Sequence, residues 1–141
     1  MKNLQIRAYL PEDEEAVIDL WQRCNLVVAH NNPQDDIARK GKVDPDLFLV
    51  GLRKGQVVAT CMAGYEGHRG WMNYLAVSPQ YRRDGIATKM MKTAEEKLLA
   101  RGCPKINLQI RETNIEVIRF YQSLGYFKDP VVSMGKRLVT Q

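Results

Sequence analysis

A strand, a glycine-containing loop and a long helix in direct succession constrain the fold of this chain more than any other feature. Trp71 to Val77 is an apolar run typical of a strand, and Ser78-Pro79 closes it. Gly85 precedes a stripe of apolar residues at helical spacing, which predicts a helix that ends before Gly102 and Pro104. The stripe consists of Ile86, Ala87, Met90, Met91, Ala94, Leu98 and Leu99. A strand that leads into such a helix indicates a sheet covered by helices.

The rest of the chain continues this alternation of strands and helices. Further segments have the apolar pattern of a strand. They are residues 3–9, 47–52, 57–63, 105–110, 126–127 and 131–138. Helix starts are predicted by the acids after Pro11, by Asn32 before Pro33, and by a capping box from Thr113 to Glu116. The element order predicts a single α/β domain over residues 1–141, with a central, mostly antiparallel sheet, one parallel junction and flanking helices.

Length, hydropathy and charge exclude several classes of protein. A chain of 141 residues with 45% hydrophobic and 26% charged residues fits one folded domain and not a disordered chain. It contains no apolar run long enough for a membrane span and no apolar leader, which favours a cytoplasmic protein with no membrane partner. The net charge of +5 is scattered along the chain, so it suits an anionic ligand and gives little support to an RNA-binding module.

The three cysteines, Cys24, Cys61 and Cys103, predict quiet thiols in a reducing compartment. They form no Cys-x-x-Cys pair, and their odd number would leave one unpaired in a disulfide framework. The only histidines are His30 and His68, and no spaced Cys/His cluster is present. We therefore expect no metal site.

The loop before the long helix suits a pyrophosphate group. A helix start leaves N–H groups unpaired beside the positive end of the helix dipole. Gly85 has no Cβ and Ala87 is small, so the backbone there can approach an anion closely. The segment lacks the P-loop pattern. Taken alone, it is equally well explained as an ordinary strand-to-helix turn.

Two sequence blocks resemble the GNAT superfamily of N-acetyltransferases. Arg82-x-x-Gly85-x-Ala87, after Tyr74 to Val77, resembles the acyl-CoA signature of that family. Asn114 to Tyr126 resembles its N-x-x-A-I-x-x-Y-x-x-x-G-[FY] element, and the two blocks have the family's order and separation. Shorter segments are similar to the bacterial YpeA-type acetyltransferases. These are Gly64 to Gly70, Arg101 to Ile106 and Gly135 to Leu138.

The resemblance implies acetyl-CoA as the cosubstrate and an amine of a small molecule or peptide as the acceptor. The strand with Leu75 and Val77 and the strand from Asn107 to Ile110 would be parallel neighbours that splay apart, with the pantetheine arm between them. The residues it assigns to acetyl-CoA are Leu75, Ala76, Val77, Arg82, Arg83, Asp84, Gly85, Ile86, Ala87, Thr88 and Asn114. Among these, the N–H groups from Arg83 through Thr88 would hold the pyrophosphate. The resemblance is also compatible with a homodimer.

The resemblance also implies a mechanism of direct attack by the amine on the thioester. The backbone N–H of Leu75 would stabilise the charge on the carbonyl oxygen, and Tyr121 would protonate the leaving thiolate. A core role is the alternative for Tyr121, because Ile118, Tyr121 and Leu124 share a helical face. For Asn114, the alternative to a role in binding acetyl-CoA is a structural role at the start of the helix.

Two departures from the family pattern leave parts of the mechanism open. Arg83 stands where the family often has glycine, and Asp84 adds a negative charge that Arg82 and Arg83 can offset. Gln109 and Asn73 stand where some members carry a glutamate base, and neither can take a proton. The candidates for the base are Glu66, Glu112, His68 and a water chain.

The sequence gives little information about the acceptor, and a second class of function stays open. Val27 to Asn32 and Gly64 to Gly70 would flank the acceptor. Glu66, Asp35 and Asp36 could attract an amine, although the two aspartates are equally explained as helix-start acids. The alternative to an enzyme is a non-catalytic acyl-CoA-binding regulatory module, which would keep the Gly85 loop without a competent acid and base.

Overall fold

A five-stranded mixed sheet forms the first of the two units into which the chain divides. The computed structural model describes residues 3–29 and 31–139, and the two units are residues 1–108 and 109–141. The sheet has the order β1-β2-β3-β4-β5. Its strands are β1 (Leu4–Ala8), β2 (Phe48–Arg53), β3 (Gln56–Tyr65), β4 (Gly70–Val77) and β5 (Ile106–Leu108). The first four strands are antiparallel neighbours and β5 is parallel to β4, which confirms the predicted fold class.

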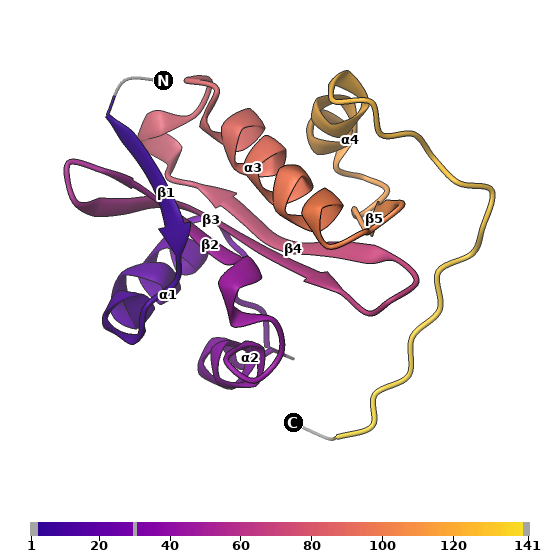
Figure 1. Cartoon of the computed structure of the whole chain (residues 1–141), viewed down its shortest axis with the longest axis horizontal. Helices are drawn as coiled ribbons and strands as arrows, with labels where there is room; N and C mark the ends of the chain where they lie inside the picture. Colours follow the sequence, from indigo (N-terminus) through magenta and orange to yellow (C-terminus); the bar gives the residue numbers. More distant parts are fainter. Residues whose placement is uncertain (1–2, 30, 140–141) are drawn as a thin grey trace. The chain divides into compact units, whose positions relative to one another are not determined.

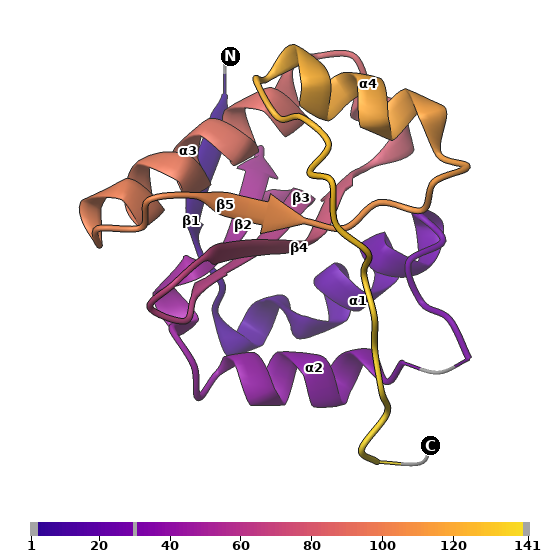
Figure 2. The same cartoon turned by 90° about the vertical axis from the view of Figure 1, so that its right-hand side faces the viewer.

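Helices cover both faces of this sheet. The helices of the first unit are α1 (Glu14–Arg23), α2 (Pro33–Lys40) and α3 (Ile86–Ala100). Helix α3 lies on one face, whereas α1 and α2 lie on the other (Figures 1 and 2). Short 3-10 helices, η1 (Pro11–Asp13), η2 (Pro45–Leu47) and η3 (Pro79–Tyr81), precede α1, β2 and the loop before α3. The Asn32 cap is confirmed, because its side chain accepts a hydrogen bond from the Asp35 N–H at 3.1 Å.

The apolar stripe of the long helix packs against the sheet as predicted, with one exception. The buried residues of α3 are Ile86, Met90, Met91, Ala94 and Leu98. Leu99 is 72% exposed, so its assignment to the stripe was wrong. Gly51 lets the helix approach the sheet closely, because an added Cβ there would lie 3.0 Å from the Met90 sulfur. The spacing of Leu99 places it one position past the face that the sheet covers.

A separate apolar cluster fills the layer between the sheet and helices α1 and α2. Its buried members are Val17, Leu20, Trp21, Ile37, Phe48, Val50, Leu52, Met62 and Ala76. Trp21 is at its centre and is fully buried. Burying a large apolar side chain contributes about 1.5–3 kcal/mol, so this cluster is a main source of stability for the first unit.

The second unit contains helix α4 (Ile115–Ser123). Its cap is Asn114, whose Oδ1 accepts from the Val117 N–H at 3.4 Å. The predicted capping box led by Thr113 was therefore wrong by one residue. The backbone turns into the helix after Asn114, so Asn114 is the residue whose side chain reaches the third helical N–H.

The two strands predicted at the C-terminal end are wrong. Among the described residues of the second unit, neither 126–127 nor 131–138 forms a strand. A segment with an apolar strand pattern forms a strand only where a neighbouring strand pairs with its backbone and its apolar side chains are buried. The side chains here stay largely in solvent, with exposures of 77% for Val131, 86% for Val132 and 89% for Leu138. The strand predicted over 105–110 is also shorter, since β5 covers Ile106–Leu108.

In the part of the chain that the structure describes, none of the helices combines the length and the apolar character needed to cross a membrane.

Candidate functional site

Strand β4 departs from regular geometry at Tyr74 and Leu75. The flanking pairs with β3 are Thr60–Ala76 and Met62–Asn73. Tyr74 and Leu75 together therefore oppose the single residue Cys61, which is the arrangement of a β-bulge. Tyr74 has a φ of 51°, in the left-handed region that bulky residues rarely adopt. A bulge bends the strand and interrupts its ladder, so the backbone groups at this point are turned out of the regular pairing.

Beyond its first residues, β4 has no β5 partner. The parallel register begins with Gly70 opposite Ile106 and ends with Met72 opposite Leu108. Strand β4 continues to Val77, and in the described part of the first unit nothing extends the β4–β5 ladder beyond Met72. The bulge therefore lies on a stretch of β4 that is not paired with β5. The splaying of the two strands that the family resemblance implies also involves residues 109–110, which belong to the second unit, and it stays a prediction.

The loop between β4 and α3 has the geometry expected of an anion site. Gly85 is the residue before the helix, with a φ of 78°, and no side chain caps the helix there. The helical hydrogen-bond ladder starts with the Lys89 N–H, which donates to the Gly85 carbonyl at 3.1 Å. The N–H groups of Ile86, Ala87 and Thr88 consequently have no acceptor inside the helix. They lie at the positive end of the α3 dipole, where a negative group is stabilised.

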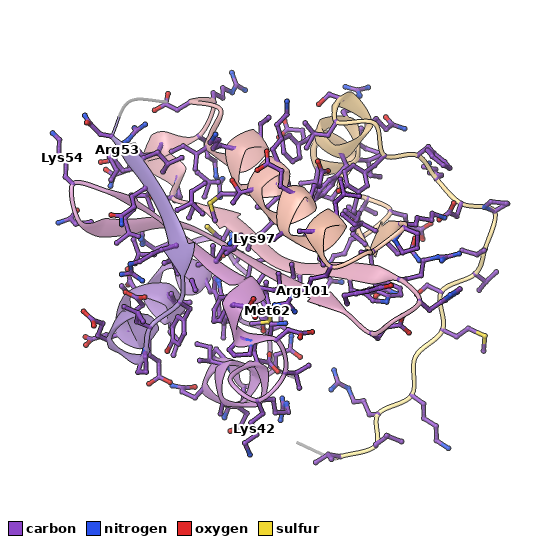
Figure 3. The ribbon with its side chains drawn as sticks, viewed as in Figure 1. Lys42, Arg53, Lys54, Met62, Lys97 and Arg101 are labelled. Carbon is purple, nitrogen blue, oxygen red and sulfur yellow. The ribbon has the colours of Figure 1, made fainter. Side chains whose placement is uncertain are left out.

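A residue missed by the sequence analysis neutralises the acidic side chain of this loop. Arg53 Nη1 lies 3.2 Å from Asp84 Oδ2, and the guanidinium is 4.9 Å from the centre of the Tyr81 ring. Arg53 and Lys54 lie at the turn between β2 and β3 (Figure 3). The charge of Asp84 is thus offset by an arginine of β2, whereas the sequence analysis expected Arg82 and Arg83 of the loop to offset it. No local pattern could have indicated this pair, because the two residues are distant in sequence.

Arg82 ties the loop back to the end of β4. Its Nε donates to the Val77 carbonyl at 3.3 Å, and the Cys24 thiol donates to the same oxygen at 3.4 Å. Arg23 Nη1 donates to the Ser78 hydroxyl at 3.0 Å. The C-terminal end of α1 and the loop therefore hold the end of β4 together. The Val77 carbonyl thus accepts hydrogen bonds from the protein itself.

Asp36 is more than a helix-start acid. Its Oδ2 accepts a hydrogen bond from the Tyr74 hydroxyl at 2.5 Å, and its Oδ1 lies 2.7 Å from Arg39 Nη2. Burial raises the pKa of the Tyr74 hydroxyl above its usual range, and the bond to Asp36 raises it further. Tyr74 therefore stays protonated and connects the β4 bulge to α2.

Glu66 is a poor candidate for the base. Its carboxylate accepts the backbone N–H groups of His68 and Arg69, each at 2.5 Å. The bond from Arg69, followed by that from His68, holds the pKa of Glu66 below its usual range. Its observed role is to close the turn between β3 and β4. His68 and Glu112 are exposed, and His30 lies outside the described residues.

In the second unit, Tyr121 is buried and its ring contacts two other aromatic rings. It is 8% exposed, and its ring meets those of Phe120 and Tyr126 edge-on at 5.1 Å and 5.5 Å. Asn114 serves as the helix cap described above, which is the plain alternative for that residue. Gln109 Nε2 donates to the Ser133 hydroxyl at 2.5 Å. The catalytic role of Tyr121 and the binding role of Asn114 stay predictions.

The cysteines are unpaired and mostly buried. Cys61 and Cys103 are buried and Cys24 is half-buried. Burial raises the pKa of the Cys61 thiol to about 12, so this thiol is inert at neutral pH. Across residues 3–29 and 31–139, the His, Cys, Asp and Glu side chains nowhere form a group that could hold a metal ion.

Known proteins share this sequence and this fold. The family model described as "Acetyltransferase (GNAT) family" matches residues 14–126. An acetyltransferase of Sodalis glossinidius (strain morsitans) is 50% identical over 137 residues, which cover 96% of each chain. The crystal structure of Ard1 from Thermoplasma volcanium has a TM-score of 0.80 at 24% identity, covering 89% of this chain and 83% of that one. The structure of AAC(6')-Iy in complex with a bisubstrate analog, CoA-S-monomethyl-acetylneamine, has a TM-score of 0.77 at 17% identity, covering 95% and 98% of the two chains.

Proposed function

Because the chain belongs to the GNAT family of acetyltransferases, we propose that it transfers the acetyl group of acetyl-CoA to a primary amine. The observation that carries this proposal is the start of α3. There, the backbone N–H groups after Gly85 have no side-chain cap and stand at the positive end of a 15-residue helix. A pyrophosphate fits such a donor set. A structural relative, AAC(6')-Iy, is known in complex with a bisubstrate analog of CoA.

The binding residues divide between the loop and the bulge. The backbone N–H groups from Arg83 through Thr88 hold the pyrophosphate, with Arg82 and Gly85 shaping the loop. The pantetheine arm binds along the edge of β4 that is not paired with β5, at Leu75, Ala76 and Val77. Asn114 contacts the end of that arm. Acetyl-CoA supplies an activated acyl group, and the chain supplies position and charge stabilisation.

The residues that act on the reacting atoms are Leu75 and Tyr121. The Leu75 N–H stabilises the negative charge that grows on the carbonyl oxygen when the amine attacks. The Tyr121 hydroxyl, of a type with a reference pKa of about 10, protonates the departing thiolate. Of the candidate bases, Glu66 is the least suited, because its carboxylate is engaged by two backbone N–H groups. His68, Glu112 and a water chain are the candidates that the mechanism retains.

We further propose that residues 1–141 work as one domain in the cytoplasm. The family match from 14 to 126 crosses the boundary between the two units at 108, which supports a single functional domain. Three unpaired thiols fit a reducing compartment. The acceptor is an amine of a small molecule or of a peptide, and a homodimer is compatible with these features.

The proposal is tested by measuring free thiol released from acetyl-CoA with a panel of small amines and peptides. We expect turnover with at least one acceptor, and a rise in Tm with acetyl-CoA that adenine alone does not produce. At a hundredfold excess over its Kd, a ligand stabilises the folded state by about 2.7 kcal/mol. A Tm unmoved by millimolar acetyl-CoA would contradict the proposal. Binding without turnover on any acceptor would favour the regulatory module.

Tyr121→Phe tests the assignment of the acid. We expect kcat to fall by about 10²–10⁴-fold, while acetyl-CoA affinity and Tm stay close to wild type, because the phenyl ring keeps the aromatic contacts. A thioester with a more acidic thiol should recover part of the rate. If Tm falls and kcat per folded molecule does not, Tyr121 is a core residue and has no part in the chemistry.

A further inference from the structure

We propose that the hydroxyl of Thr60, oriented by Trp21, sets the direction of the Leu75 N–H. Both residues would then be positioning residues for the thioester carbonyl. This inference rests on the proposed function, because it concerns the N–H group that the proposed mechanism uses. It starts from one peptide group, the bond between Tyr74 and Leu75 at the β4 bulge.

The carbonyl of that peptide group is held from β3. Thr60 Oγ1 donates to the Tyr74 carbonyl oxygen at 2.8 Å. A trans peptide group is planar, so its C=O and its N–H point in opposite directions. The Leu75 N–H consequently points away from the hydroxyl of Thr60 on β3. The strand on the other side of β4 is β5, whose ladder with β4 ends at Met72. The N–H is thus directed to the edge of β4 that the pantetheine arm would occupy.

The polarity of the Thr60 hydroxyl is decided by Trp21. The indole Nε1–H donates to Thr60 Oγ1 at 2.9 Å, and an indole nitrogen can only donate. The hydroxyl therefore donates its single proton to the Tyr74 carbonyl. Both Thr60 and Trp21 are fully buried, with 0% exposure, so water does not compete with these bonds. The order of donation runs in one direction, from Trp21 through Thr60 to the Tyr74 carbonyl, and such chains strengthen each bond.

The side chain of Tyr74 is held as firmly as its carbonyl. Its ring stacks on Trp21 with centroids 3.8 Å apart and planes 12° from parallel. Its hydroxyl donates to Asp36 at 2.5 Å. These contacts keep a bulky residue at a φ of 51°, which its intrinsic preferences oppose. A donor that is aimed before the substrate arrives needs no reorganisation during the reaction, which is the property that makes an N–H effective against a developing charge.

The test compares Thr60→Val, which keeps the β-branched shape but removes the hydroxyl, with Thr60→Ser, which keeps the hydroxyl. We expect Thr60→Val to lower kcat by about tenfold to a hundredfold, less than the loss of a whole oxyanion donor, with KM for acetyl-CoA within about twofold. Thr60→Ser should recover most of the lost rate. Thr93→Val is the matched control, because Thr93 is half-buried on α3 and its hydroxyl donates to the Lys89 carbonyl within the helix. It should leave kcat unchanged.

A second variant separates positioning from stability, since Thr60→Val leaves the Trp21 N–H buried without an acceptor. Trp21→Phe/Thr60→Val removes both partners, which restores much of the stability that a lone buried donor costs. We expect the double variant to fold and to stay slow. If its kcat returns to wild type together with its Tm, the two residues support the core only, and the inference is overturned.

A readout independent of turnover is the amide signal of Leu75. Binding of acetyl-CoA should shift this amide proton downfield in the wild type and in Thr60→Ser, and clearly less in Thr60→Val. Equal shifts in all three would overturn the inference and leave the proposed function standing. A wild type that neither binds acetyl-CoA nor turns over would instead refute the proposed function, and the inference with it.

Discussion

The bulge of β4 and the loop before α3 hold the same unusual backbone conformation by different means. Tyr74 has a φ of 51°, and Arg83 and Gly85 have φ values of 70° and 78°. At the bulge, buried partners on other elements hold the backbone, since Thr60, Trp21 and Asp36 all contact Tyr74. In the loop, Gly85 adopts the conformation without steric cost.

The difference matters because the two regions would bind different parts of one ligand. A pyrophosphate carries a full charge and tolerates some variation in the position of its donors. A carbonyl that develops charge needs a donor aimed at one point. An exposed glycine loop suits the first task, and a buried hydrogen-bond chain suits the second. Variants of the two regions should therefore fail in different ways.

The largest effect is expected from Trp21→Ala, which removes the centre of the α1 layer and the ring under Tyr74. Truncation of a fully buried tryptophan costs about 3–5 kcal/mol, so the free energy of unfolding should fall by that amount in urea titrations. Turnover of the remaining folded molecules should fall as well. A loss of less than about 1 kcal/mol would mean that the bulge does not depend on this packing.

Gly85→Val changes the loop, and it should weaken acetyl-CoA binding more than it lowers the free energy of unfolding. A β-branched residue at a positive φ costs about 1–3 kcal/mol, and its Cβ would crowd the N–H groups that receive the pyrophosphate. We expect the Kd for acetyl-CoA, measured by calorimetry, to rise by at least about tenfold, or 1.4 kcal/mol.

Gly102→Val is the matched control for that variant. Gly102 has a φ of 87° just after the other end of α3, and no atom lies within 4 Å of an added Cβ. It should carry a similar backbone cost without a change in acetyl-CoA affinity. Equal Kd values for the Gly85 and Gly102 variants would show that Gly85 is only a turn residue.

A smaller effect is expected from Arg53→Gln, which removes the charge that pairs with Asp84. Exposed ion pairs contribute about 0.2–1 kcal/mol, so acetyl-CoA affinity should fall by up to about fivefold, and less at high salt. Arg53→Gln/Asp84→Asn should recover it. Lys54→Gln, at the same turn, is the control. If the single and double variants bind alike, Asp84 does not oppose the anion.

The smallest effect is expected from Arg83→Gly. Glycine removes the steric cost of the positive φ at this exposed position, which stabilises the folded state. Glycine also raises the conformational entropy of the unfolded chain, which destabilises the folded state by a similar amount. The unfolding free energy should change by less than about 1 kcal/mol, with an unchanged Kd for acetyl-CoA. A large loss of affinity would show that the Arg83 side chain, and not its N–H, contacts the ligand.

Local patterns were sufficient for much of the helical structure. The Asn32 cap and the buried positions of α3 followed from neighbouring residues, because caps and helical periodicity depend on side chains three or four positions apart. The same reasoning misplaced the α4 cap by one residue and assigned strands to 126–127 and 131–138. A strand is completed by a partner that its own residues do not specify.

The sequence by itself determined the α/β class, the family blocks and the glycine at the head of α3, because each depends on residues close together in the chain. Only the tertiary structure decided that Tyr74 is in a bulge, that Thr60 and Trp21 hold its carbonyl, and that Arg53 neutralises Asp84. Those contacts join β3 to β4, α1 to β3, and β2 to the loop. Their register and direction arise from long-range pairing of elements, so no local periodicity encodes them.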